Sequence, residues 1–564
     1  MQRNFQALAE KTFDMVIIGG GATGAAIAFD AALRGLSVAL IDKGDFSAGT
    51  SAASTKLLHG GLRYLANGEI SLVREALRER RIWQRIAKHL VSPMPFLLPV
   101  FDNFRQGKTL THLGLTAYDW LAFDRNIGGD KAQHIPTHRI LNIPQTLGLV
   151  PGLKRDGLAG GMIYHDVIMH APERLCLALI QSAVEAGAVA VNHAEFIDFT
   201  RQKHQLTGIK VKNRLENSGR RKTITVKAQL IINAAGAWAD QLMQRAIEDK
   251  TASQIESKRT PPKKLVRSKG IHFLTENITR GAALATPVDD EHLFVVPWQG
   301  RSLFATTDTR FDDAPDKVCV TSEDIAILLR KVQTALPGLG ITQRDIIHAY
   351  AGLRPLVADI DDPANTTYGM SRGAEIVDHR EAGGPSGLIS ALGGKWTTSR
   401  RLGEQVVDLA IKRLGQPARQ CQSAKTLLVS CPHQPLDDFI EDMRQEFSAL
   451  NRALIMRLSQ FYGTALPDML ATDITGLKTM KDPILAAQSI YAIKHEMAMR
   501  LDDVVNRRLV MAPTGIVKPT HITAIADYMA QHFGWSAAEK KRQIAQTRAA
   551  LKLPPKPSKA ARQQ

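Results

Sequence analysis

Apolar strand residues run directly into three glycines in the stretch Met15-Val16-Ile17-Ile18-Gly19-Gly20-Gly21-Ala22-Thr23-Gly24, and a helical pattern follows over Ala25–Arg34. In such a turn Gly19 allows the tight bend, Gly21 lets the backbone approach a pyrophosphate, and Gly24 lets the helix pack on the strand. Free N–H groups at the start of the helix point at the phosphates. The stretch therefore predicts a strand, turn and helix that bind a dinucleotide.

An acidic residue strengthens this prediction. Asp42 ends the next apolar strand, Ser37–Ile41, near the distance of about 20 residues expected in this fold. A carboxylate at this point accepts hydrogen bonds from ribose hydroxyls and repels the 2′-phosphate of NADP. Asp42 therefore favours FAD or NAD as the cofactor.

Length and composition bound the class of protein. At 564 residues the chain exceeds one ordinary core, so two or three domains are expected. The contents of 44% hydrophobic and 23% charged residues are typical of a soluble globular protein. Four widely spread cysteines form neither a disulfide framework nor a metal-ligand pattern. We expect a reducing cytoplasm and no metal.

Targeting segments do not stand out in the sequence. Residues 1–11 are polar, unlike a signal peptide, and Asp30 and Arg34 interrupt the best apolar run. A cytoplasmic location without a spanning helix is therefore expected.

The charge is unusual. With 72 Lys plus Arg against 55 Asp plus Glu, the formal net charge is +17. A nucleic acid, an anionic lipid surface or an anionic small substrate would each complement it, and so would a merely soluble basic surface. Nucleic acid is disfavoured because the chain carries no recognised binding motif.

Hydrophobic patterns divide the chain into three parts. Residues 1–415 alternate strand and helix patterns, and strand-like segments at Ile271–Leu274 and Leu293–Pro297 favour an antiparallel substrate sheet. Residues 416–550 are almost wholly helical in pattern, and the Pro/Lys-rich tail 551–564 is expected to be disordered. The apolar segment Lys108–Phe123 is either core or an amphipathic membrane contact, and its pattern favours core.

Glycines beside cations recur in three further clusters. They are Thr50–Tyr64, which contains Lys56, His59 and Arg63, then Tyr350–Leu356, and Ala391–Thr398. Glycines let the backbone pass close to a flat ring, and cations meet an anion there. A fourth small-residue turn, Ala234-Ala235-Gly236, ends an apolar strand where doubly wound sheets bind ligands.

The motifs Ser54-Thr55-Lys56-Leu57-Leu58-His59-Gly60-Gly61-Leu62-Arg63-Tyr64-Leu65, Leu353-Arg354-Pro355-Leu356 and Gly393-Gly394-Lys395-Trp396-Thr397-Thr398 resemble those of the FAD-dependent glycerol-3-phosphate dehydrogenases. Ser268–His272, Thr306–Asp308 and Arg500–Arg508 also match segments of this family, so the resemblance covers nearly the whole chain. It implies an α/β fold: a Rossmann-like FAD-binding domain of the D-amino-acid-oxidase type, an antiparallel-sheet substrate domain and an all-helical C-terminal domain. Asp42 stands where many members carry Glu, and Trp396 replaces a smaller aliphatic residue.

Sequence and resemblance together assign the site. The cofactor-binding residues are Gly19, Gly20, Gly21, Ala22, Thr23, Gly24, Asp42, Ser51, Ser54, Lys56, Ala235, Gly236, Gly393, Gly394, Lys395 and Thr397. The substrate-binding residues are Arg63, Tyr64, Arg354 and Lys395, and the catalytic residues are His59, His272 and Arg354. Lys395 either binds phosphate or stabilises reduced flavin. The base is His59 or His272, since imidazole titrates near neutrality, and Arg354 could polarise the hydroxyl.

The implied reaction converts sn-glycerol 3-phosphate to dihydroxyacetone phosphate, with hydride passing from C2 to flavin N5 of FAD and electrons then passing to ubiquinone or menaquinone. Delivery to a membrane quinone implies peripheral contact with the anionic inner face of the cytoplasmic membrane. The oligomeric state stays open, with a homodimer as one option.

Three other readings compete. A glycerol-3-phosphate oxidase would use oxygen with the same pocket. An amine or amino-acid oxidase would need an arginine for a carboxylate but no cluster of cations. A non-catalytic FAD-stabilised scaffold, or a nucleic-acid-binding protein, is suggested only by the net charge of +17.

Overall fold

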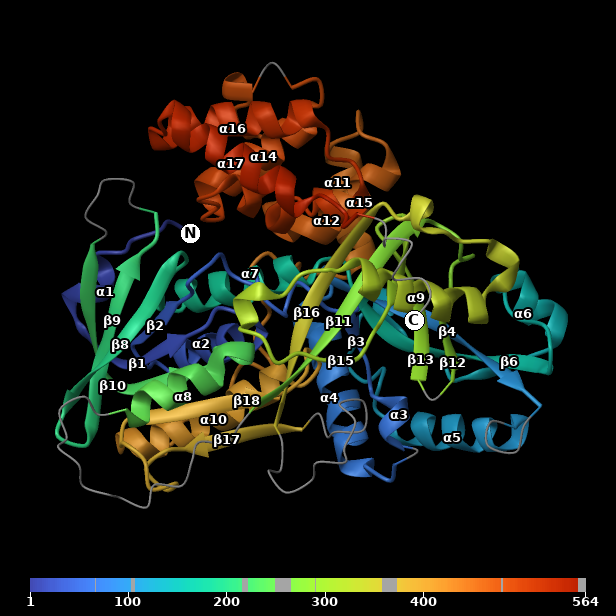
Figure 1. The fold of residues 1–564 in the computed structure, drawn as a ribbon, viewed down its shortest axis with the longest axis horizontal. Helices are drawn as coiled ribbons and strands as arrows, with labels where there is room; N and C mark the ends of the chain where they lie inside the picture. The colour runs from blue at the N-terminus through green and yellow to red at the C-terminus, as the bar shows by residue number, and fades with distance from the viewer. Residues whose placement is uncertain are drawn as a thin grey trace.

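The computed structural model describes residues 1–65, 67–102, 107–215, 222–248, 265–289, 291–357, 373–477 and 480–555. Two sheets with their helices form the body of the molecule, and a group of helices from the end of the chain covers one side of it (Figure 1).

The first sheet is doubly wound and has eight strands, in the order β17-β18-β10-β1-β2-β7, with β9 and β8 added beside β10. The pairs that link β7, β2, β1, β10 and β18 are all parallel. This confirms the Rossmann-like prediction. The strands are β1 (Thr12–Ile18), β2 (Val38–Ile41), β7 (Val189–Val191), β8 (Ala194–Gln202), β9 (Gln205–Asn213), β10 (Thr223–Asn233), β17 (Ala374–Asp378) and β18 (Leu388–Gly393).

Helix α2 (Ala22–Leu33) lies at the centre of the first domain and packs against α7 (Pro172–Glu185) and α10 (Ser399–Leu414). Its many alanines let these neighbours approach closely. A Cβ added at Gly403 of α10 would lie 2.9 Å from the Ala26 carbonyl carbon, so contact between the two helices depends on that glycine.

The second sheet has ten strands and is antiparallel except for the β12–β4 pair. This confirms the predicted antiparallel substrate sheet. Its strands are β3 (Leu57–Leu58), β4 (Val91–Phe101), β5 (Arg139–Leu141), β6 (Leu158–Met169), β11 (Leu265–Glu276), β12 (Ala283–Val288), β13 (Glu291–Trp298), β14 (Arg301–Ala305), β15 (Thr309–Arg310) and β16 (His348–Val357). The remaining helices of the body are α1 (Ala7–Glu10), α3 (Leu62–Leu65), α4 (Ile70–Ile86), α5 (Lys108–Leu121), α6 (Ile143–Leu149), α8 (Ala239–Ile247) and α9 (Ser322–Ala335).

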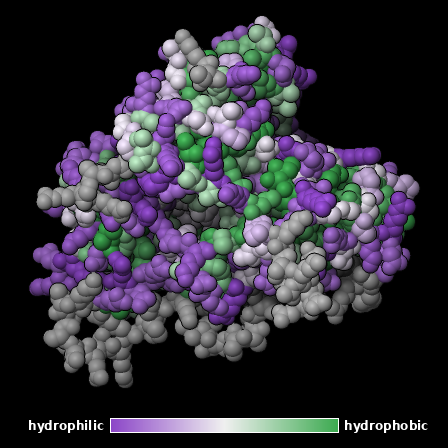
Figure 2. Space-filling view, turned by 45° about the horizontal axis from the view of Figure 1, so that its top comes forward, coloured by the Kyte–Doolittle hydropathy of each residue, from purple (hydrophilic) through white to green (hydrophobic). Residues whose placement is uncertain are grey.

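Beyond α10 the described chain is helical, as its pattern predicts. The helices are α11 (Leu436–Glu446), α12 (Arg452–Tyr462), α13 (Leu466–Leu470), α14 (Pro483–His495), a π-helical turn (Asp503–Arg508), α15 (Met511–Thr514), α16 (Pro519–Phe533) and α17 (Ala537–Ala550). Figure 2 shows these helices rising from the body and hydrophilic side chains over much of this face.

Of the predicted tail 551–564, residues 556–564 lie outside the described residues. The rest returns to the body, because Ser322 at the start of α9 donates a hydrogen bond to the Pro555 carbonyl (2.6 Å). No helix within the described ranges has the length and apolar character needed to cross a bilayer.

Candidate active site

One cavity of about 830 Å³ runs from the glycine turn after β1 to the face of the second sheet, within the size range of cofactor and ligand sites. It brings together most of the predicted site. The predicted residues in its wall are Gly19, Gly21, Ala22, Thr23, Asp42, Ser51, Ser54, His59, Arg63, Tyr64, Ala235, Gly236, His272, Arg354, Gly393, Gly394 and Lys395.

The glycine turn has the geometry that the sequence predicts. Gly19 has a φ of +113°, and a Cβ there would lie 2.5 Å from the Ala234 carbonyl oxygen. A Cβ at Gly24 would lie 1.8 Å from the Gly19 carbonyl oxygen, so helix and turn touch through backbone alone. At Gly21, just before α2, a Cβ would crowd the Ser51 hydroxyl at 2.9 Å. Side chains at Gly19 and Gly24 would collide with backbone and break the turn, and a side chain at Gly21 would crowd the cavity wall where the backbone approaches a pyrophosphate.

Asp42 lies at the carboxyl end of β2, beside this turn. Its two carboxylate oxygens accept backbone N–H groups from Gly20 (2.7 Å) and Gly44 (2.8 Å). Each oxygen keeps a second lone pair, since a carboxylate has about four acceptor positions. The carboxylate is thus fixed in orientation and can still accept ribose hydroxyls. Glycine cradle, helix N-terminus and acid together fit the pyrophosphate and ribose of FAD.

At the other end of the cavity, β11 and β16 form an antiparallel ladder that positions the polar groups. Ser268 lies opposite Arg354, Gly270 opposite Gly352, and His272 opposite Tyr350. Alternate residues of a strand share one face, so the ladder presents all three pairs to the same side. The central glycines leave space: a Cβ at Gly270 would lie 2.1 Å from an Arg354 nitrogen.

The Arg354 guanidinium is anchored on several oxygens. It donates to the hydroxyls of Ser268 (2.9 Å) and Thr306 (2.8 Å) and to the Thr307 carbonyl (3.1 Å). The Asp308 carboxylate, which is 3% exposed, lies 3.6 Å away. These contacts hold the guanidinium plane against the cavity wall, and Arg354 is ready to bind an anion without reorganising.

The His272 imidazole is buried, and its Nε2 lies 3.0 Å from the Thr55 hydroxyl. Its ring stacks on Tyr350, with ring centroids 4.9 Å apart. Burial, together with the positive charges of Arg354 and Lys56, holds the pKa of His272 well below its usual value. His272 is therefore a neutral imidazole near pH 7, and its Nδ1 has no hydrogen-bond partner among the residues that the structure describes.

Two further cations meet on one aromatic ring. The Lys395 ammonium lies 3.9 Å from the Tyr64 ring centroid, and the Arg63 guanidinium lies 5.3 Å from it. Tyr64 thus holds two positive groups that come from distant parts of the chain. Both cations line the same cavity as Arg354, and three positive groups in one cavity suit an anionic ligand.

Some predicted residues lie behind the wall. The Thr397 hydroxyl accepts from the His59 N–H (3.1 Å) and donates to the His59 carbonyl (3.2 Å), so it positions His59. Lys56 points away from the cavity toward Glu173 (3.1 Å) and the Ala52 carbonyl (2.5 Å). Gly20 and Gly24 are also absent from the cavity wall. The roles of all the predicted site residues, in the wall or behind it, stay predictions.

Sequence reasoning missed several residues of the wall. His292 and Phe294 lie on β13, and Trp238 follows β10; all three line the cavity. The two-residue spacing of His292 and Phe294 in a strand pattern was the available signal. Burial and the nearby charge of Arg63 lower the pKa of His292. The predicted departure at Trp396 has a structural partner, since its indole N–H donates to the Ser51 carbonyl (2.9 Å).

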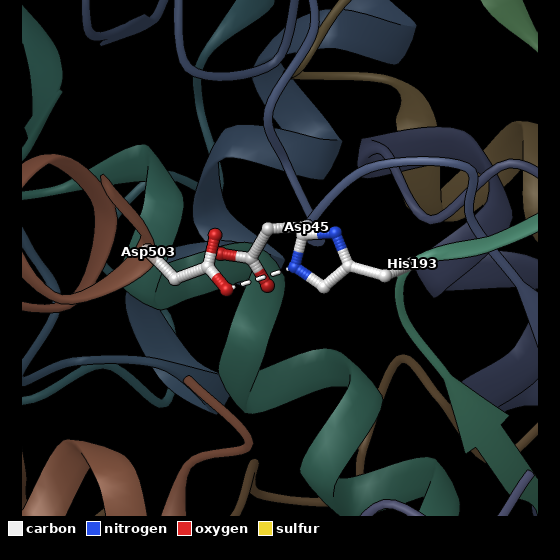
Figure 3. A group of neighbouring side chains, drawn as sticks. All are labelled: Asp45, His193 and Asp503. Atoms are coloured by element: carbon white, nitrogen blue, oxygen red, sulfur yellow. Dashed lines mark hydrogen bonds and ion pairs between the residues drawn. The ribbon is translucent and has the colours of Figure 1, made fainter. Parts of the chain in front are cut away.

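Behind the cavity wall, the ligand atoms of Asp45, His193 and Asp503 all lie within 4.8 Å of one another (Figure 3). Arginines already neutralise this group. Arg508 donates to both Asp45 oxygens (2.7 and 2.9 Å), and Arg507 bridges Asp45 (2.8 Å) and Asp503 (2.6 Å). Burial would raise the pKa of Asp503, but His193 and Arg507 outweigh burial and lower it. These contacts describe an ion-pair network between the body and the C-terminal helices.

Comparison with known proteins agrees with this geometry. Residues 14–409 match the family described as FAD dependent oxidoreductase, and residues 421–540 match the C-terminal domain of alpha-glycerophosphate oxidase. The chain is 32% identical to a glycerol-3-phosphate dehydrogenase of Synechocystis, over 96% of this chain and 97% of the relative. It is 33% identical to an aerobic glycerol-3-phosphate dehydrogenase of Staphylococcus haemolyticus, over 89% and 87%.

A solved glycerol-3-phosphate dehydrogenase from Bacillus halodurans, complexed with FAD, aligns with a TM-score of 0.77 at 27% identity over 97% of this chain and 95% of that one. Fold, cavity and family match together define an FAD-dependent oxidoreductase of the D-amino-acid-oxidase type. Within that class, the chain belongs to the FAD-dependent glycerol-3-phosphate dehydrogenases, as its motifs predict.

Proposed function

We propose that this protein oxidises sn-glycerol 3-phosphate to dihydroxyacetone phosphate and delivers the electrons to a membrane quinone. Three cations carry the proposal: Arg63, Arg354 and Lys395 all line the cavity, and Arg63 and Lys395 meet on the Tyr64 ring. A phosphate dianion needs several charge-assisted donors, whereas an amino-acid substrate would need one arginine for its carboxylate. The names of the relatives support the same substrate.

FAD, when bound, supplies the hydride acceptor. The residues of this chain bind and orient the substrate and move its proton. The cations hold the phosphate, and anchored Arg354 polarises the C2 hydroxyl. As C2 loses hydride, the hydroxyl proton goes to an imidazole and the carbonyl bond forms. His272 is the better base candidate, because its ring is fixed by Thr55 and Tyr350 and is neutral near pH 7.

The quinone acceptor places the protein at a membrane. We infer a cytoplasmic protein that binds peripherally to the inner face of the cytoplasmic membrane, and its net charge of +17 supports this because anionic headgroups attract Lys and Arg.

An anaerobic titration tests the proposal. The flavin-replete protein receives sn-glycerol 3-phosphate while the visible absorption of oxidised flavin is followed. Rapid bleaching, reversed faster by a soluble quinone analogue than by air, is the expected result. Reversal faster by air would replace the quinone with oxygen and make the protein an oxidase. No bleaching of a flavin-replete sample would refute the substrate.

A further inference from the structure

Large apolar side chains are exposed along one short segment at the edge of the second domain. Leu110, Leu113, Trp120, Phe123 and Ile127 are all more than half exposed, with Trp120 at 82% and Phe123 at 72%. Exposed apolar groups gathered in this way mark an interaction surface. We call these five residues the α5 surface.

Helical spacing explains the gathering. Leu110, Leu113 and Trp120 lie three and seven residues apart on α5, so they share one face of that helix. The opposite face is packed: Leu115 and Tyr118 are buried, and the Tyr118 hydroxyl donates to Asp166 of β6 (2.9 Å). The predicted core role of this segment therefore holds for its inner face only. Figure 1 shows α5 at the side of the molecule opposite the C-terminal helices.

The exposed charges in the segment that carries the α5 surface have one sign. Within residues 107–143, which the structure describes without a gap, the exposed charged side chains are Lys108, Lys131 and Arg139.

The acids of the same segment are turned inward and paired. Asp119 lies 2.6 Å from His138, Asp124 lies 2.9 Å from Arg74, and Asp130 lies 3.3 Å from Lys88, with carboxylate side chains at most 19% exposed. An apolar stripe with aromatic residues, in a segment whose exposed charges are all cations, complements an anionic lipid interface.

We propose that the α5 surface docks the protein on an anionic bilayer, with Trp120 and Phe123 at the level between headgroups and acyl chains. A second copy of the chain fits less well, because a two-fold contact through the same patch would face the cations of both copies against each other. A quinone acceptor in the bilayer requires a membrane contact, and the α5 surface would provide it. The functional reason for this docking therefore rests on the proposed function.

Vesicle sedimentation of the FAD-loaded protein tests the docking. One set of vesicles contains phosphatidylcholine alone, and the other contains equal amounts of phosphatidylcholine and phosphatidylglycerol. We expect binding to the anionic vesicles that weakens as salt rises. The variant L113S/W120S should reduce the bound fraction by about tenfold or more, because both removed groups would sit in the interface.

A matched variant controls for the loss of exposed apolar groups elsewhere. Met456 of α12 and Ile516, which lies between α15 and α16, are also exposed (45% and 37%). Because both lie in the C-terminal part of the chain, M456S/I516S should bind vesicles as the unmodified protein does. Vesicle binding that survives in L113S/W120S, or is absent in the unmodified protein, would overturn the proposal. A third outcome is that the unmodified protein self-associates without binding vesicles and that L113S/W120S abolishes this self-association. This result would assign the α5 surface to a contact with a second copy and would also overturn the proposal.

A separate readout distinguishes this proposal from the proposed function. Turnover of sn-glycerol 3-phosphate with a soluble dye acceptor should be equal in L113S/W120S and the unmodified protein, since neither residue lines the cavity. No turnover in any of the proteins would refute the proposed substrate and leave the vesicle result to decide the docking.

Discussion

Arg354 is fixed by hydroxyls and by Asp308 before any substrate arrives. We predict that Arg354→Ala lowers kcat/KM for sn-glycerol 3-phosphate by about 100-fold or more while FAD stays bound, because a preorganised donor is lost. Arg354→Lys should recover only part of this loss, since an ammonium cannot reproduce the planar fork. Steady-state kinetics and the flavin spectrum check both. Unchanged kcat/KM in Arg354→Ala would show that Arg354 does not bind the substrate in the transition state.

The Lys56 ammonium, the Tyr350 ring and the His272 imidazole stack on one another, and this arrangement influences the protonation of His272. The Lys56 ammonium lies 4.9 Å from the Tyr350 ring centroid, and Tyr350 stacks on His272. The positive charge of Lys56 contributes to the lowered pKa of His272. In K56M/E173Q, which removes the buried ion pair as a unit, that pKa should rise. The acid limb of kcat/KM should then move to higher pH, and a pH profile measures it. An unmoved limb would mean that His272 is not the base or does not sense Lys56.

For single residues, the sequence predicted which residue types form the site better than it predicted whether their side chains point into the cavity. Arg354 and His272 were found because they lie in recognisable motifs, and alternation along β11 and β16 turns both to one side. Lys56 lies in an equally recognisable motif, but its left-handed backbone (φ 65°) turns it away from the cavity. No pattern in a single sequence tells whether the side chain of such a residue points into the cavity or away from it.

Helix α2 meets the glycine turn through backbone atoms only. In Gly24→Ala the new methyl group would overlap the Gly19 carbonyl oxygen, so turn or helix must shift by an amount that costs about 1–3 kcal/mol. We predict that this variant retains much less FAD, measured as the ratio of flavin to protein absorption after purification.

Gly148→Ala in α6 is the control, because a Cβ there meets no atom within 4 Å. It should retain FAD fully. Equal retention by Gly24→Ala would show that the turn tolerates a side chain and that the fingerprint had been misread.

Helices and strands could be predicted from the sequence where the hydrophobic pattern of the segment matches its burial in the folded protein. The strands around the glycine turn and the helices after α10 formed as expected. The segment of α5 was ambiguous, because an apolar stripe has the same pattern whether protein or lipid covers it. His292 and Phe294 were missed because β13 looks like an ordinary strand until β12 and β14 place it beside the cavity.

At the scale of the whole molecule, buried ion pairs join the C-terminal helices to the body. Arg508 contacts Asp45, and both are at most 2% exposed. We predict that Arg508→Met lowers the free energy of unfolding by about 3–5 kcal/mol, because it leaves a buried carboxylate without its main partner. Arg444→Met removes an exposed pair with Glu441 and should leave stability nearly unchanged, because solvent screens exposed ion pairs. Thermal unfolding of both variants checks this, and equal effects would refute the role of the network.

Buried imidazoles make the stability depend on pH. Burial lowers the pKa of His89 to about 3, and burial also lowers that of His272. Between pH 6.5 and 5 the unfolded chain binds protons on these groups and the folded protein does not. Stability should therefore fall with falling pH, and His89 alone should account for about 2 kcal/mol of the loss by pH 5. Denaturant unfolding at both pH values measures the loss. His89→Gln should reduce it, and the same loss in that variant would contradict the assignment.

The order of strands in the first sheet has a consequence for biosynthesis. β1 pairs with β10 and, through it, with β18, so the sheet that carries the glycine turn is complete only when Leu388–Gly393 has been made. A ribosome needs roughly 20–80 s to reach that point. Until β10 follows, one edge of the nearly all-apolar β1 is open, and open edges pair with other chains. Loading of the cofactor therefore belongs to the last stage of synthesis, and a chaperone that shields β1 until then would raise the yield of flavin-loaded protein.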